Sequence, residues 1–172
     1  MIIAREGYTL NHQERQARIE SYGKAYDRLI AALETLPKEM WQFKPAPDDW
    51  SIHEQIIHLA DSEANSYSRV RRGIAEPGSA VLGYDQDRWA SNLNYHAQSC
   101  EEALQLFKLL RLMSYRLIVS LPDDTWAHTI EHSENGTMTL DDWLVVYDDH
   151  VLGHIQQMQA NYEAWLQAPK AF

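Results

Sequence analysis

Apolar residues recur at helical spacing in four long segments of the chain. In the first segment, from about Glu14 to Leu36, they follow at steps of four, three, four and three: Tyr22, Tyr26, Leu29, Leu33 and Leu36. Such steps place the side chains on one stripe of a helix. Pro37 predicts where this helix ends.

The second helix has a marked beginning. Ser51 and Glu54 form an S-x-x-E capping box, in which each side chain can satisfy a free N–H of the first turn. The stripe that follows contains Ile52, Ile56, Leu59, Glu63, Tyr67, Val70 and Ile74, and Glu63 is its one polar member. Residues 76–94 show no steady period, which is typical of a functional loop, and we expect this loop to cover a site.

Two further helices are predicted, at about His96 to Ser120 and about Thr139 to Leu166. Thr139 and Asp142 repeat the capping-box spacing at the start of the last one. Its stripe contains Trp143, Tyr147, His150, His154, Met158, Asn161 and Trp165.

The four helices form two similar halves. In each half a Leu-Pro pair is followed by a Trp, a loop and a capped helix that carries histidines. Two helix–loop–helix halves suit a four-helix bundle. With 172 residues and only 7 glycines, we predict an all-α protein that forms a single domain over residues 1–172.

Composition excludes several classes of function. The net charge of −10 disfavours binding to nucleic acid. The lone Cys100 excludes an internal disulfide, and we expect it to be a buried, inert thiol. No apolar run approaches the length of a membrane span, and the first residues lack the pattern of a secretory signal. We therefore expect a cytoplasmic protein that does not bind membranes.

His150 and His154 stand at positions i and i+4 of the last predicted helix, so their rings project from one face, one turn apart. Both lie near the middle of the buried stripe, where an unsatisfied polar group costs roughly 1–3 kcal/mol. A shared metal ion would satisfy the rings. Hydrogen bonds to carboxylates, hydroxyls or water would do so equally well.

A third metal ligand would have to come from another helix, and His58 is the candidate. It lies off the apolar stripe of its helix, on a side shared with Ser62, Asn65 and Arg69. Periodicity alone favours a solvated face here, and a polar wall facing a cleft is the alternative.

Three segments carry a family resemblance: WSIHEQIIHLADSEANSYSRV at residues 50–70, YDQDRWA at 84–90 and HVLGHIQQM in the last helix. The chain resembles the DinB superfamily, and within it the YfiT-like metal-dependent hydrolases. The resemblance implies an up-down-down-up four-helix bundle in which His58, His150 and His154 bind one divalent metal ion. It also implies a homodimer, and a low-molecular-weight thiol as cosubstrate in those members that are S-transferases.

Three neutral imidazoles would leave open positions on the ion, as in catalytic sites. Bound water can then ionise near pH 7, and a bound thiol is held as thiolate. The ligands alone do not choose between hydrolysis and thiol transfer, nor between zinc, nickel and iron. We expect a metal-dependent enzyme acting on an electrophilic small molecule. The alternatives are a non-catalytic bundle with structural histidines and a dimerisation module built on 6 Trp and 9 Tyr residues.

Four more residues are candidates around the metal. Asp61 could orient the His58 ring, or be a surface acid. Tyr147 could donate its hydroxyl near the metal, or be a core aromatic. Asn65 and Arg69 could contact an anionic substrate, or be exposed.

Overall fold

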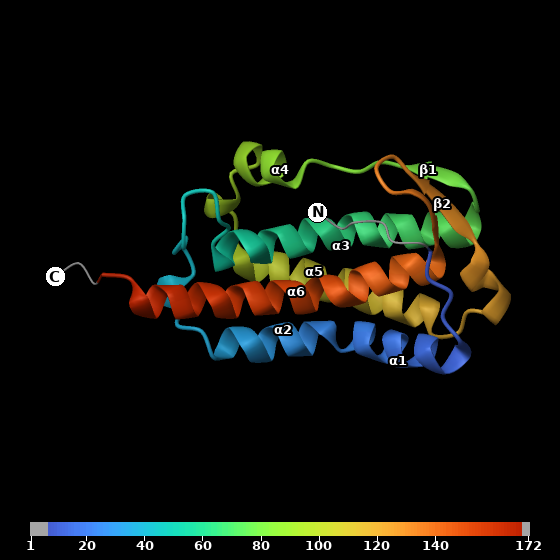
Figure 1. Ribbon diagram of the computed structural model, residues 1–172, viewed down its shortest axis with the longest axis horizontal. Coiled ribbons are helices and arrows are strands. Elements are labelled where there is room, and N and C mark those ends of the chain that lie inside the picture. The colour runs from blue at the N-terminus through green and yellow to red at the C-terminus, as the bar shows by residue number, and fades with distance from the viewer. Residues whose placement is uncertain (1–6, 170–172) are drawn as a thin grey trace.

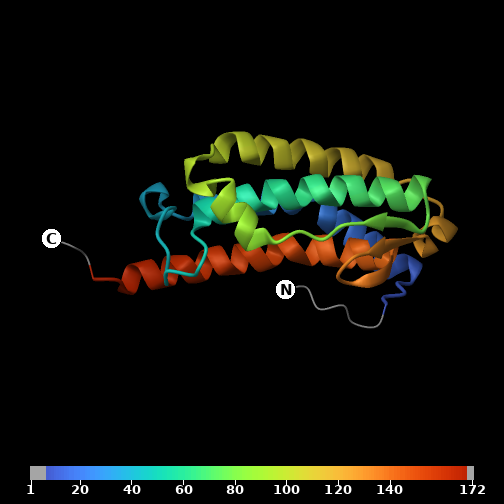
Figure 2. The ribbon, with the colours of Figure 1, turned by 90° about the horizontal axis from the view of Figure 1, so that it is seen from above.

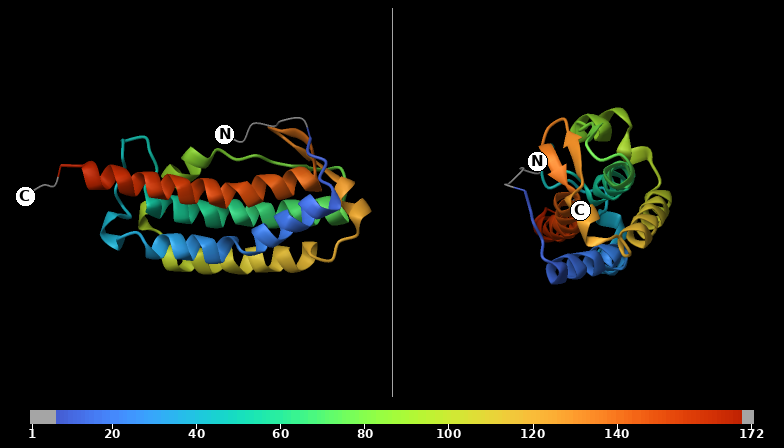
Figure 3. Two further views of the ribbon diagram at one scale, coloured as in Figure 1. Left: turned by 60° about the horizontal axis from the view of Figure 1, so that its bottom comes forward. Right: turned by 90° about the vertical axis from the view of Figure 1, so that its right-hand side faces the viewer.

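The computed structural model describes residues 7–169, and five long helices make up its bundle (Figure 1). They are α1 (His12–Gly23), α2 (Ala25–Glu34), α3 (Ile52–Ala75), α5 (Cys100–Ile118) and α6 (Leu140–Gln167). Helices α1 and α2 follow one another as one column, α3 and α5 run back in parallel, and α6 returns beside them (Figure 3). The predicted all-α bundle with up-down-down-up order is confirmed.

The first predicted helix is interrupted at Lys24, which separates α1 from α2. The Lys24 N–H is shared between the carbonyls of Glu20 and Ser21, at 3.3 and 3.1 Å. Next to it, Gly23 lies so close to Tyr115 of α5 that a Cβ atom there would stand 2.7 Å from the ring. The apolar stripe continues across the joint, which is why the hydrophobic pattern predicts a single helix.

Both predicted capping boxes are present. The Glu54 backbone N–H donates to the Ser51 hydroxyl at 3.2 Å, and the Ser51 N–H donates to the Glu54 carboxylate at 2.8 Å. Thr139 and Asp142 make the same pair of bonds at 3.1 and 2.7 Å. These boxes fix the first turns of α3 and α6, the two helices that carry the candidate ligands.

A long crossover joins the parallel helices α3 and α5, and it runs back along the outside of the bundle (Figures 1 and 2). It contains β1 (Ser79–Val81), α4 (Gln86–Asn92) and the 3-10 turn η2 (Tyr95–Ala97). The prediction that the third long helix begins at His96 is wrong. Ser99 is the N-cap of α5, because its hydroxyl accepts the Glu102 N–H at 3.2 Å.

A small three-stranded sheet was not predicted. β2 (Thr129–His132) pairs in parallel with β1 and antiparallel with β3 (Gly136–Thr139). Two 3-10 turns, η1 (Lys38–Met40) and η3 (Asp123–Ala127), lie in the connections after α2 and α5. Since β1 belongs to the crossover and β2 precedes α6, the sheet connects the two halves of the chain at one end of the bundle.

A buried ion pair joins α3 and α5 in the core. Arg111 of α5 donates to Glu63 of α3 at 2.6 Å, and Tyr22 of α1 donates to the other carboxylate oxygen at 2.7 Å. Glu63, the polar member of its predicted stripe, is thus matched by two donors from two other helices. Within residues 7–169, no helix combines the length and the apolar character that crossing a bilayer requires.

Candidate metal centre

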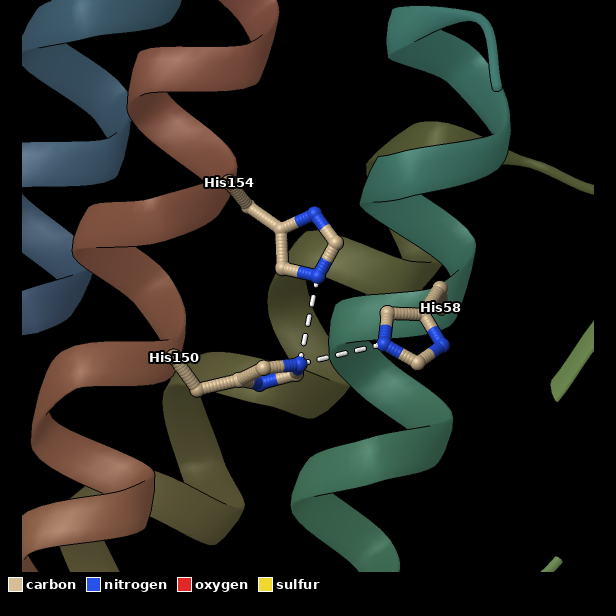
Figure 4. A group of neighbouring side chains, drawn as sticks. All are labelled: His58, His150 and His154. Atoms are coloured by element: carbon tan, nitrogen blue, oxygen red, sulfur yellow. Dashed lines mark hydrogen bonds between the residues drawn. The ribbon is translucent and has the colours of Figure 1, made fainter. Parts of the chain in front are cut away.

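Three imidazole rings from two helices face one another (Figure 4). His58 comes from α3, and His150 and His154 come from successive turns of α6. The Nε2 atom of His150 lies 3.2 Å from Nε2 of His58 and 3.1 Å from Nε2 of His154. One ring nitrogen from each residue lies within 4.8 Å of the other two. The structure therefore brings together all three predicted ligands.

His58 is enclosed, with 1% of its surface exposed. The solvated face that periodicity favoured for this residue is therefore the wrong interpretation. The Trp50 ring contacts the His58 ring edge-on at a centroid distance of 4.7 Å. The ring of Tyr84, in the crossover, has its centroid 6.5 Å from that of His58. The polar side of α3 faces a covered cleft, and a covered polar wall has the same periodicity as a solvated one.

The orientation of the His154 ring is set by Gln55. Nδ1 of His154 lies 3.3 Å from Oε1 of Gln55. The Gln55 amide nitrogen donates to the Trp50 carbonyl at 3.2 Å, so the amide oxygen faces the imidazole. An oxygen acceptor requires the proton on Nδ1, which leaves the Nε2 lone pair directed at the other two rings.

Burial keeps the three rings neutral. Burial and the charge of His154 lower the pKa of His58 to about 3, and burial lowers the pKa of His154 to about 4. Burial and the two neighbouring rings lower the pKa of His150 well below its usual value. Near pH 7 each ring therefore has a free lone pair, which is the form that binds a metal ion.

The donor set fits a divalent transition metal. Tetrahedral coordination with metal–nitrogen distances of 2.0–2.1 Å separates neighbouring ligand atoms by about 3.3 Å, close to the two Nε2 separations here. Nδ1 of His58 is also buried without a partner among the described residues. That atom would carry the proton when Nε2 is a ligand. Imidazole donors suit zinc, nickel and iron.

The three rings line a cleft of about 1300 Å³. We call this space the histidine cleft. Its walls include Trp50, Gln55, Ser62, Arg69, Gly83, Tyr84, His132, Trp143, Tyr147, Gln157 and Asn161. The crossover supplies Gly83, Tyr84 and the first residues of α4 to the wall of the cleft, so the predicted cover over a site is present.

The four other candidates have different environments. The Asp61 carboxylate accepts a hydrogen bond from Tyr95 at 2.6 Å and makes none with His58, so the predicted orienting bond is absent. Asn65 donates to the Asp61 carbonyl and is not part of the cleft wall. Arg69 and Tyr147 do line the cleft, and Arg69 donates to the Tyr147 hydroxyl at 2.7 Å.

Sequence reasoning missed three residues of the cleft. Gln55 precedes His58 by three residues, and Asp61 follows it at the same spacing. On a helix both neighbours lie beside the histidine, so both are candidates for a hydrogen bond near the metal. Trp50 precedes the helix cap and has no pattern of its own. His132 lies in a strand too short for a period to be read.

Comparisons with known proteins agree with this picture. The family model of the DinB superfamily matches residues 21–158. A protein of Oceanobacillus iheyensis named "Putative metal-dependent hydrolase" is 29% identical over 112 residues, which are 63% of this chain and 64% of that protein. The chain thus matches slightly less than two thirds of that relative's length.

Bacillus subtilis YfiT, which has the same functional name, is 24% identical over 147 residues, covering 77% of this chain and 83% of YfiT. The solved structure of YfiT, a four-helix bundle of unusual topology, superposes with a TM-score of 0.86 at 20% identity and covers 95% of this chain and 94% of that one. The fold is therefore shared with YfiT. With the family model matching most of its length, the chain belongs to the DinB superfamily.

Proposed function

We propose that His58, His150 and His154 bind one divalent metal ion and that the chain is a metal-dependent enzyme acting on an electrophilic small molecule. The convergence of three neutral imidazoles, two of them buried and His150 half-buried, on one point in the wall of a cleft supports this proposal. The curated relatives named as metal-dependent hydrolases agree with it. Hydrolysis is the leading reaction.

A bound divalent ion would supply Lewis acidity and lower the pKa of coordinated water toward 7. The protein's own residues prepare the site for that chemistry. Gln55 fixes the tautomer of His154. Trp50 and Tyr84 exclude water from the sides of the His58 ring, and the open cleft admits a reactant from the remaining side.

Metal analysis of three single variants tests the site. His58→Ala, His150→Ala and His154→Ala should each lower bound zinc or nickel from about one equivalent per chain to near zero. His53→Ala is the matched control, because His53 does not line the histidine cleft and bonds to Gln42 and the Gln98 carbonyl. Equal metal content in all four variants would contradict the proposal.

Activity is tested on the metal-loaded protein. Simple ester and amide substrates should be hydrolysed by the zinc or nickel form, and turnover should disappear in His58→Ala while persisting in His53→Ala. Binding of metal without turnover on any substrate would favour the alternative of a non-catalytic helical bundle.

A low-molecular-weight thiol is a second candidate reactant. The cleft volume of about 1300 Å³ exceeds the roughly 300–1000 Å³ typical of a site for one small ligand, so a thiol and an acceptor could bind together. S-transferase activity would appear as loss of free thiol that depends on both the acceptor and the metal. Water-only turnover in the same assay would assign a hydrolase.

A homodimer in the cytoplasm completes the proposal. Leu106, Leu109, Leu112 and Met113 expose apolar surface along α5, a surface that dimerisation would cover. Sedimentation equilibrium should give twice the mass of 20.0 kDa. A monomer at all concentrations would remove this part of the proposal and leave the metal site untouched.

A further inference from the structure

The histidine cleft contains one Lys or Arg side chain among the described residues, Arg69. Its Nη1 donates to the Tyr147 hydroxyl at 2.7 Å and its Nη2 donates to the Leu82 carbonyl at 2.6 Å. No carboxylate of residues 7–169 lies within 4.0 Å of its guanidinium. Arg69 is therefore a half-buried positive charge, held by neutral oxygens and without a counter-charge. A bound anion would stabilise such a charge by a charge-assisted hydrogen bond.

The Tyr147 hydroxyl is held in the same place. It accepts the hydrogen bond from Arg69, and its own proton has no acceptor among the described residues. Tyr147 is 4% exposed and lines the cleft, and its ring centroid lies 6.4 Å from that of His150. A second donor is thus available next to the guanidinium, one helical turn from a candidate metal ligand.

His132 contributes a third donor. Its Nδ1 accepts two backbone N–H bonds, from Glu134 at 3.2 Å and from Asn135 at 3.3 Å. An atom that accepts two hydrogen bonds holds no proton, so the proton of the neutral ring is on Nε2. Burial and the charge of Arg69 lower the pKa of His132, which favours this neutral form.

The strand register places His132 beside Arg69. His132 of β2 is the partner of Val81 of β1, and the next residue, Leu82, provides the carbonyl that Arg69 binds. Both His132 and Arg69 line the cleft. Three side chains from α3, α6 and β2 thus present donors to the cleft wall, and the exposed Glu134 carboxylate lies near His132.

We propose that Arg69, Tyr147 and His132 form an oxyanion-binding subsite, so that the substrate carries a carboxylate or phosphate group a few bonds from its reacting atom. The role in substrate recognition rests on the proposed function, and anion binding itself does not. The acidic side chains of the cleft are exposed: Asp48, Asp49, Asp85, Asp87 and Glu134. They disfavour polyanions, so the fitting substrate is a small molecule with one such group.

Titration of the metal-free protein with sodium acetate and sodium phosphate at constant ionic strength tests the subsite. Two-dimensional NMR of backbone and arginine side-chain N–H groups reports the dissociation constant. The expected result is a saturable shift of the Arg69 and His132 resonances. Tighter binding of acetate would identify a carboxylate substrate, and tighter binding of phosphate a phosphorylated one.

Arg69→Gln should weaken anion binding about 10- to 100-fold, the usual effect of losing a charge-assisted hydrogen bond. Arg72→Gln is the matched control, since it removes the same charge from an exposed residue paired with Glu76. Tyr147→Phe removes only a hydroxyl and should weaken binding severalfold, so it carries the test should Arg69→Gln fail to fold.

Two results would overturn the subsite: no saturable binding of either anion, or equal weakening by Arg69→Gln and Arg72→Gln. His58→Ala separates this proposal from the metal site. That variant should lose the metal and retain the dissociation constant for acetate. A protein that binds metal but no anion would refute the subsite alone, and one that binds anions but no metal would refute the proposed function alone.

Discussion

Nδ1 of His154 lies 3.3 Å from Oε1 of Gln55, although the two residues are 99 positions apart in the chain. The contact joins α3 to α6 beside the three converging rings. Gln55→Leu keeps the volume of the side chain and removes the acceptor. The affinity for zinc should fall about 10- to 100-fold, as for other residues that orient a metal ligand. Competition with a chelating dye measures this change.

Gln98→Leu is the control for Gln55→Leu. Gln98 is exposed, donates to the Leu93 carbonyl and does not line the histidine cleft. The Gln98→Leu variant should bind zinc with the same affinity as the parent protein. An unchanged affinity in Gln55→Leu as well would show that packing alone orients the His154 ring.

The stability of the metal-free protein should depend on pH through the buried rings. The pKa of His58 is lowered from 6.5 to about 3 and that of His154 to about 4. Between these values and 6.5 the unfolded chain binds more protons than the folded one, so the free energy of unfolding falls as the pH drops below 6.5. Each ring contributes up to about 1.4 kcal/mol per pH unit.

Urea unfolding at pH 7 and pH 5 measures this dependence. His58→Gln removes one of the titrating rings, so its free energy of unfolding should fall less steeply as the pH is lowered. The slope against pH should be smaller by the contribution of one proton, about 1.4 kcal/mol per pH unit. An identical pH dependence in the two proteins would show that His58 binds a proton as readily in the fold as in the unfolded chain.

Removing one partner of the Glu63–Arg111 pair should lower the free energy of unfolding strongly, whereas replacing both partners should lower it less. Both side chains are almost fully buried, with their atoms 2.6 Å apart. Glu63→Leu or Arg111→Met alone leaves an uncompensated buried charge and should cost about 3–5 kcal/mol. The double variant Glu63→Leu with Arg111→Met should cost clearly less than the sum of the single changes. Additive costs in urea unfolding would argue against a direct pair.

The capping box of α6 should contribute measurably to stability. Thr139→Ala removes the hydroxyl that accepts the Asp142 N–H at 3.1 Å, and should cost about 1 kcal/mol. Thr137→Ala makes the same chemical change at an exposed residue of β3 and should have a smaller effect. Calorimetry should give a lower melting temperature for Thr139→Ala than for Thr137→Ala. Equal melting temperatures would contradict the prediction.

Capping chemistry and apolar stripes were sufficient to predict the long helices, because both depend on residues close in sequence. Ser51 with Glu54 and Thr139 with Asp142 place the starts of α3 and α6 to within one residue. The break at Lys24 was not predictable, because it depends on Tyr115 of another helix approaching Gly23. The strands were missed because three or four residues are too few for a period of two to stand out.

The candidate site also contains some residues that local sequence predicts and others that it does not. Spacing alone placed His150 and His154 together on the stripe of α6. His58 required the family resemblance, since the periodicity of α3 cannot tell a covered cleft from solvent. The bonds to His132 Nδ1 are local and come from the backbone N–H groups of Glu134 and Asn135. Gln55 instead acts through its Oε1 contact with His154, 99 residues away. A contact over such a separation leaves no trace in local sequence.

The parallel pairing of Val81 with His132 has a consequence for how the protein can be divided. A cut in the surface turn between α5 and η3 would yield two polypeptides, one bearing His58 and the other His150 and His154. The β1–β2 ladder and the packing of α3 on α6 would allow the fragments to complement each other. Only the reassembled pair would bind zinc tightly, so metal affinity would serve as a direct reporter of fragment reassembly.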